Sequence, residues 1–283
     1  MDFTKEIQDI ALQLFQENKI ELFIGYQKLA EENRTVPFIA TSAEEAKNLV
    51  FNDESAYNLT NYLTMEHAKG KKVGIVVKGC DSRALNMLIT EGQIKRENLQ
   101  VVGVCCTGVK NDKGELYGNC ANCIMPDAVI HDSLLGTPKG KPEYQADPEV
   151  LQLKEKSQEE RARFFEDVFD NCIRCNACRL SCPLCYCDKC AIDQESAAFY
   201  NAANTVPNAA TALLTWSLHL AGRCVDCRNC EKACPKNLPL HLLHKYNEMV
   251  IYENFQHYIS GMNEKERGAF YQYKLEDPND FIL

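Results

Sequence analysis

The first half of the chain alternates between the apolar spacing of helices and that of strands. Asp2 to Asn18 carries apolar residues at helical intervals and predicts a helix at the start of the chain. Glu21 to Gln27 and Val36 to Ala40 have the composition of short strands. A second helix is expected over Ser42 to Val50, because this segment begins at a residue type that caps helices.

A strand, a helix and another strand follow in order. Lys72 to Lys78 (KVGIVVK) is a continuous apolar run of strand length, rich in β-branched residues, and Leu99 to Cys105 is a second such run. Asp81 to Glu91, between them, has helical spacing. Since continuous apolar strands are typical of parallel sheets covered on both faces, the pattern predicts a parallel βαβ unit. The fold class expected for the first half is α/β.

The second half has a helical pattern after a break. Gly136 to Pro148 (GTPKGKPEYQADP) is rich in Gly, Pro and charge, which is typical of a linker. Helical spacing then covers Pro148 to Asp170, Pro207 to Leu220 and Pro239 to Glu253, with almost no strand signal. The predicted organisation is an α/β domain over 1–137, a linker over 138–156, a small all-α domain over 157–255 and a C-terminal tail over 256–283.

Composition excludes several classes of function. The chain has 283 residues and a formal charge of -9, a balance that argues against a nucleic-acid partner. No apolar run approaches the roughly 20 residues that a membrane-spanning helix needs. The N-terminus, MDFTKEIQD, is charged from its second residue, which argues against a signal peptide. The sequence therefore predicts a cytoplasmic protein with no membrane span.

The sixteen cysteines change this picture. None occurs before Cys80; five lie between Cys80 and Cys123, and eleven lie between Cys172 and Cys234. In a cytoplasmic chain thiols stay reduced, so disulfides do not explain so many. Grouped cysteines in a reducing compartment indicate metal binding.

Two of the groups have the same spacing. Cys172-x2-Cys175-x2-Cys178-x3-Cys182-Pro183 is the run found in bacterial ferredoxins, and it recurs from Cys224 to Pro235. In two-cluster ferredoxins three close thiolates bind one 4Fe-4S cubane, while the fourth cysteine of the run binds the other cubane. The predicted ligands are therefore Cys172, Cys175, Cys178 and Cys234 for one cluster, and Cys224, Cys227, Cys230 and Cys182 for the other.

A pair of structural zinc sites is the alternative, because zinc also uses CxxC spacing. Zinc sites seldom need the third cysteine and the Cys-Pro ending, and here both occur twice. Clusters are therefore the preferred interpretation of the two runs.

The second half resembles a known ferredoxin type. Forty-one residues separate Cys182 from Cys224, which is unlike a compact two-cluster ferredoxin. Together with HLAGRCVDCRNCEKACPKNLPLHLL, this arrangement resembles the α-helical ferredoxin domain of heterodisulfide reductase and Rnf-type complexes, over about residues 165 to 250. The resemblance implies an all-α domain that holds two 4Fe-4S clusters.

The first half has a resemblance of its own. KVGIVVKGCDSRALNMLI, VVGVCCTG and NCANCIMPDAVIHD are similar to the C-terminal domain shared by β subunits of deazaflavin (coenzyme F-420) hydrogenases and dehydrogenases. Those subunits, formate dehydrogenase β chains among them, pass electrons between a flavin and iron–sulfur clusters. The resemblance therefore implies FAD as a candidate cofactor, although the chain has no glycine-rich phosphate loop.

That family pattern has a Cys after the first strand, a Cys-x-Gly at the end of the second and a CxxC beyond. The matching positions here are Cys80, Cys106, Cys120 and Cys123. Loops at the carboxyl ends of parallel strands converge on one edge of a sheet, so a third 4Fe-4S cluster is expected on these four residues. Cys105 points to the opposite side of its strand from Cys106 and is interpreted as a buried core thiol.

Three cysteines in PLCYCDKC remain: Cys185, Cys187 and Cys190. They could complete or shield the neighbouring cluster site, bind an additional metal, or be structural or redox-labile thiols. Three ligands alone seldom hold a structural zinc, which normally has four. The sequence leaves these interpretations open.

Three functions compete. The first is a non-catalytic electron-transfer subunit of an anaerobic oxidoreductase (hydrogenase, formate dehydrogenase or heterodisulfide reductase-like) that joins a flavin-containing or catalytic partner subunit to an acceptor. The second is a stand-alone FAD and iron–sulfur enzyme that oxidises a hydride donor such as a deazaflavin or NAD(P)H. The third is a zinc-binding interaction module. The relay is preferred because it explains every cysteine group and the absence of a substrate-binding motif.

Overall fold

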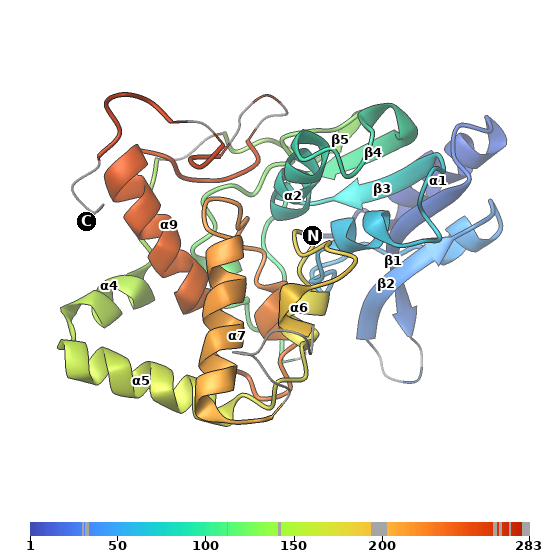
Figure 1. Cartoon of the computed structure of the whole chain (residues 1–283). Coiled ribbons are helices and arrows are strands. Elements are labelled where there is room, and N and C mark those ends of the chain that lie inside the picture. Colours follow the sequence, from blue (N-terminus) through green and yellow to red (C-terminus); the bar gives the residue numbers. More distant parts are fainter. Residues whose placement is uncertain are drawn as a thin grey trace. The chain divides into compact units, whose positions relative to one another are not determined.

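The computed structural model describes residues 1–29, 31, 34–111, 113–140, 143–193, 203–262, 265, 268–271 and 273–278 (Figure 1). The chain divides into two compact units. The first contains Met1–Glu143 together with Ser260–Glu266, and the second contains Tyr144–Ile259 together with Arg267–Leu283.

The first unit is built on a five-stranded sheet of order β2-β1-β3-β4-β5 (Figure 1). β1 and β2 are antiparallel, whereas β1, β3, β4 and β5 run parallel to one another. The strands are β1 (Leu22–Leu29), β2 (Arg34–Ala40), β3 (Val73–Val77), β4 (Leu99–Val104) and β5 (Ser133–Leu135). The predicted α/β class with a parallel strand–helix–strand unit is therefore confirmed.

The core of this unit explains why β3 is central. All five residues of β3 are buried, and Val73 pairs with Leu99 of β4. Helix α2 (Gly79–Thr90) starts at once, and the carboxylate of Asp81 accepts the backbone N–H of Lys78 at 3.0 Å. Each large aliphatic side chain buried in this way stabilises the fold by about 1.5–3 kcal/mol. The buried strand thus fixes the position at which α2 begins.

Helix α1 (Thr4–Gln16) lies where the sequence predicts it and buries Ile7, Ala11 and Leu14. The helix predicted over Ser42 to Val50 is wrong: only a short 3-10 turn, η1 (Glu45–Asn48), forms there. Its backbone has another partner, since the N–H of Val50 donates to the carbonyl of Tyr26 at 2.8 Å. The further short elements of this unit are η2 (Leu59–Thr64), η3 (Arg96–Asn98) and α3 (Gly118–Ala121).

Part of the segment predicted as a tail packs against α2. Asn86 Nδ2 donates to the carbonyl of Gly261 at 2.9 Å. Gly261 has φ +80°, and a Cβ there would lie 2.1 Å from the backbone oxygen of Arg83. Only glycine combines this backbone conformation with so close an approach.

The described part of the second unit consists of helices and loops. The helix predicted over Pro148 to Asp170 is two helices, because Ser157 caps a new one by accepting the N–H of Glu160. The elements are α4 (Pro148–Glu155), α5 (Gln158–Asn171), α6 (Ala177–Leu180), η4 (Ala191–Asp193), α7 (Val206–His219), α8 (Asn229–Lys232) and α9 (His241–Phe255).

The helices of the second unit pack on buried apolar side chains. α7 packs against α5 and α9. Trp216 of α7 is buried with its ring edge-on to His244 of α9, at 4.4 Å between centroids. A separate cluster joins Val150, Leu242 and Met249. None of the helices in the described ranges is long and apolar enough to cross a membrane.

Gly261→Ala tests the packing of the C-terminal segment on α2. The left-handed conformation alone costs about 1–2 kcal/mol for alanine, and the clash with Arg83 adds about 1–3 kcal/mol. Gly70→Ala is the matched control, because Gly70 also has positive φ but nothing lies within 4 Å of its Cβ position. In thermal unfolding of the anoxic protein, Gly261→Ala should lower Tm clearly more than Gly70→Ala. Equal shifts would show that this packing is absent.

Candidate metal centres

The two ferredoxin-type runs fold with the same backbone. In the first run Arg174 and Asn176 have φ +52° and +59°, and in the second Asp226 and Arg228 have φ +52° and +50°. A short helix follows at the same offset in each run, α6 after the first and α8 after the second. Left-handed conformations are costly for residues other than glycine and cluster at functional sites. Their repetition at equivalent positions indicates a shared structural requirement.

The first group of thiols lines a pocket. Cys172, Cys175 and Cys178 surround it, and the fourth cysteine on its wall is Cys234 of the other run. Burial raises the pKa of Cys178 to about 12, and Cys172 and Cys234 are among the thiols whose charge acts on it. The remaining lining residues are Ile173, Arg174, Asn176, Ala212, Leu213, Pro235, Lys236, Leu238 and Leu240.

The second group is more deeply buried. Burial raises the pKa of Cys182, and the neighbouring thiols of Cys227 and Cys224 raise this pKa further. Burial also raises the pKa of Cys230, and the thiols of Cys227, Cys224 and Cys182 raise it further. The two runs are also tied together by Asn229, whose Nδ2 donates to the carbonyl of Ser181 at 3.2 Å. The fourth cysteine of each run thus lies with three cysteines of the other.

These surroundings suit iron–sulfur clusters. Thiols with pKa values raised by burial, such as Cys224 at about 12, stay protonated at neutral pH unless a metal replaces the proton. Sulfurs around a tetrahedral zinc with bonds of about 2.3 Å lie roughly 3.8 Å apart, whereas a cubane takes each thiolate on a different iron.

A single metal ion needs several ligand atoms close together. In the described part of the chain, only Asp147, Glu149 and His241 place three potential ligand atoms of His, Cys, Asp or Glu within 4.8 Å of one another. The cysteine groups are spaced more widely. Their spacing therefore fits a cluster better than a single ion.

The predicted third site lies in the first unit. Cys80 is in the first turn of α2, Cys106 follows β4, and Cys120 and Cys123 lie in and just after α3. Burial raises the pKa of Cys106 to about 11, and the Cys120 and Cys123 thiols act on it further. The structure thus brings Cys106, Cys120 and Cys123 together. Cys80 and Cys106 each interact electrostatically with Lys78.

Cys105 and Cys106 have different neighbours. The pKa of Cys105 is raised by burial and then by Asp127, and its Cβ lies 3.0 Å from the position that a Cβ on Gly136 would occupy. Cys106 instead accepts the N–H of Gly108 at 3.3 Å. The two adjacent side chains therefore belong to different surroundings.

A buried ammonium beside the third site was not anticipated from the sequence. Lys78 is 2% exposed, and its Nζ lies 2.8 Å from the carboxylate of Asp81 and 3.0 Å from the carbonyl of Tyr57, to which it donates. It also contacts the hydroxyl of Tyr26, and its charge acts to lower the pKa of Cys106. The only sequence signal is a lysine that ends an apolar strand.

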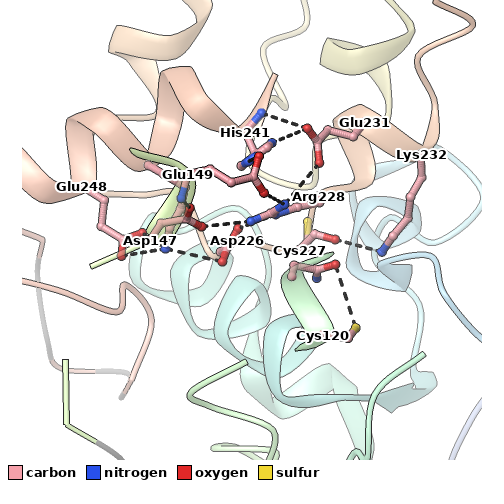
Figure 2. A network of polar contacts seen from close by, with 12 residues as sticks. Cys120, Asp147, Glu149, Asp226, Cys227, Arg228, Glu231, Lys232, His241 and Glu248 are labelled. Carbon is pink, nitrogen blue, oxygen red and sulfur yellow. Dashed lines mark hydrogen bonds and ion pairs between the residues drawn. The ribbon is translucent and has the colours of Figure 1, made fainter. Parts of the chain in front are cut away.

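A network of ion pairs surrounds the second ferredoxin-type run (Figure 2). Arg228 lies between Cys227 and Cys230 and is 7% exposed. Its guanidinium lies 3.0 Å from Asp147, 3.4 Å from Asp226 and 3.8 Å from Glu231. Since Asp147 caps α4, the network links the cysteine loop to the start of that helix.

The same network reaches α9. His241 contacts Glu231, and its Nε2 lies 3.4 Å from Glu149 (Figure 2). Lys245 lies 3.4 Å from Asp226 and 2.9 Å from Glu248. Arg228 already supplies positive charge beside Asp147 and Glu149, so this acidic group forms ion pairs instead of holding a cation.

Two comparisons with known proteins bear on these sites. Residues 171–239 match the protein family described as a 4Fe-4S dicluster domain. This is an iron–sulfur protein. The chain is also 28% identical, over 99 residues, to the F420-dependent formate dehydrogenase subunit beta of Methanocaldococcus jannaschii. That match covers 35% of this chain and 25% of the relative, so the chain spans about a quarter of the relative's length.

The comparisons confirm the resemblances predicted from the motifs: a dicluster ferredoxin segment in a chain similar to a deazaflavin-dependent formate dehydrogenase β subunit. The individual ligands, the number of clusters and the presence of FAD stay predictions.

Proposed function

We propose that this iron–sulfur protein is an electron-relay subunit of an anaerobic oxidoreductase in the cytoplasm. The observation that carries the proposal is the pair of runs with one backbone conformation, each placed beside the fourth cysteine of the other. Two adjoining cluster sites without a substrate-binding motif are what a relay requires.

The second unit would hold two clusters as an all-α dicluster ferredoxin domain over about residues 157–255. A bound 4Fe-4S cluster accepts and donates single electrons. The proposed ligands are Cys172, Cys175, Cys178 and Cys234 for cluster 1, and Cys224, Cys227, Cys230 and Cys182 for cluster 2.

The two sites differ in exposure, which gives the relay a direction of access. Cys175 is exposed and its neighbour Ile173 is 49% exposed, whereas Cys227 and Cys230 are 8% exposed each. Electron tunnelling falls off steeply with distance, so a partner protein exchanges electrons best where the ligands reach the surface. Cluster 1 is therefore the proposed point of exchange, and Arg228 with its carboxylates holds the inner loop of cluster 2 in place.

A third cluster on Cys80, Cys106, Cys120 and Cys123 would extend the relay into the first unit. Lys78 supports this, because a buried positive charge stabilises nearby thiolates and the negative charge that a cluster brings. The carboxylate of Asp81 fixes the ammonium in position.

The partners proposed are catalytic or flavin-containing subunits of a hydrogenase, formate dehydrogenase or heterodisulfide reductase-like complex. The similarity to a formate dehydrogenase subunit beta supports this class. FAD on this chain is supported by the family resemblance alone.

The relay is tested by cofactor analysis of the protein purified under anoxic conditions. We expect brown protein with about eight to twelve irons and as many sulfides per chain, from two or three cubanes. Low-potential donors should reduce it reversibly, and acid-denatured protein should release no flavin fluorescence. Stoichiometric FAD with oxidation of a deazaflavin or NAD(P)H would favour the stand-alone enzyme, and two zinc ions with negligible iron would favour the zinc module.

Double substitutions test which cysteine belongs to which cluster. Cys175→Ala should remove about four irons. Adding Cys234→Ala should remove no more, because both residues are assigned to cluster 1. Adding Cys182→Ala instead should raise the loss to about eight irons, since that residue is assigned to cluster 2. The reverse pattern, in iron content and in low-temperature EPR, would mean that each run holds its own cluster.

Cys106→Ser and Cys105→Ser form a matched pair for the third cluster. Cys105 and Cys106 follow β4 and have different neighbours, and only Cys106 interacts with Cys120 and Cys123. We expect Cys106→Ser to lose about four irons and Cys105→Ser to lose none. Equal iron content in both variants, whether lowered or unchanged, would contradict the assignment.

A further inference from the structure

Three thiols of the second unit are used by neither proposed cluster. Cys185, Cys187 and Cys190 follow the first run within a short loop that ends at η4. Burial raises the pKa of Cys185 to about 11, and Cys190 and Cys187 are the thiols that act on it. Cys190 is buried, Cys185 is partly buried and Cys187 is exposed. The three thiols thus share one neighbourhood, open to solvent at Cys187.

Arg223 holds this loop in shape from one side. Its Nη2 donates to the carbonyl of Leu184 and to the hydroxyl of Tyr186, each at 3.3 Å. The guanidinium also lies over the Tyr186 ring, 5.6 Å from the centroid. Backbone and side chain on both sides of Cys185 are therefore fixed before any ligand binds, which lowers the entropic cost of binding.

Arg179 faces the same thiols and has an unused donor. Its guanidinium pairs with Asp193, and the charges of Cys190 and Cys185 act on it. Among the described residues, its Nε is buried without a hydrogen-bond partner. Leaving a buried donor unpaired is unfavourable, so such an atom usually meets a partner in the functional state. A metal-bound thiolate or sulfide would supply that acceptor.

We propose that Cys185, Cys187 and Cys190 hold a further thiolate-bound metal centre, with Arg179 as its hydrogen-bond donor. The three thiolates of this loop fill three of the four coordination positions, so the fourth is open to another ligand. Because Cys187 is exposed, that open position faces the solvent. The inference goes beyond the proposed relay, which uses none of these residues. The centre is an iron–sulfur cluster, because the three sulfurs do not all lie within 4.8 Å of one another and a cluster takes each thiolate on a different iron. Its iron comes in addition to that of the two or three cubanes of the relay.

The first experiment compares metal content in the full-length protein purified anoxically. The variant replaces all three cysteines by serine (Cys185→Ser, Cys187→Ser and Cys190→Ser), and Cys105→Ser is the control for loss of a thiol elsewhere. We expect the triple variant to lose about four irons and four sulfides relative to the control. Loss of a single zinc or iron would overturn the cluster. The EPR signals of the two ferredoxin-type clusters should persist. Metal content equal to that of the control would overturn the proposal.

A second measurement uses the unmodified protein, so it does not depend on a variant that folds. Cys187 is exposed, and a free exposed thiol reacts readily with iodoacetamide. If it binds metal, it should be protected in the anoxic holo-protein and become labelled once chelator has removed the metal, as located by mass spectrometry. Complete labelling of Cys187 with no change in metal content would overturn the proposal.

Discussion

Buried thiols impose the constraint on which the second unit depends. Cys182, Cys224 and Cys230 lie where burial raises the pKa of each thiol, and they are surrounded by other sulfurs. The second unit also buries apolar side chains, among them Leu213, Trp216 and Leu240, besides the cluster of Val150, Leu242 and Met249. Metal–thiolate bonds at the buried cysteines would add to this apolar burial in holding the second unit together. Metal binding and folding are coupled in such a unit.

The two ferredoxin-type runs share a backbone but differ in charge. The left-handed residue that follows the second cysteine is Asn176 in the first run and Arg228 in the second. Arg228 is buried among carboxylates that extend to α4 and α9. Removing one partner of a buried ion pair typically costs about 3–5 kcal/mol, because the other charge is left unpaired, so Arg228 and its carboxylates depend on one another. The difference agrees with the proposed roles of cluster 2 as the inner site and cluster 1 as the point of exchange with partners.

Several elements could be predicted because the signal was local. The apolar run of β3 and the helical spacing of α2 predicted a parallel unit without any long-range information. The break between α4 and α5 also has a local signal, because Ser157 and Glu160 form a capping box. The continuous helical spacing on both sides nevertheless led to the prediction of a single helix. The helix expected after Ser42 failed for another reason: Val50 pairs with Tyr26, and that contact is distant in sequence.

What the sequence determined by itself was the chemistry of the sites. Ligand type and spacing are local properties, so two cubane runs and a further thiol group could be identified from the order of cysteines alone. Only the tertiary structure decided which distant residues meet. It brings the ammonium of Lys78 to the carbonyl of Tyr57, packs Gly261 on the backbone of Arg83 and pairs Val50 with Tyr26. Such contacts join residues whose separation along the chain carries no periodic signal, and they form only when the packed elements exclude water.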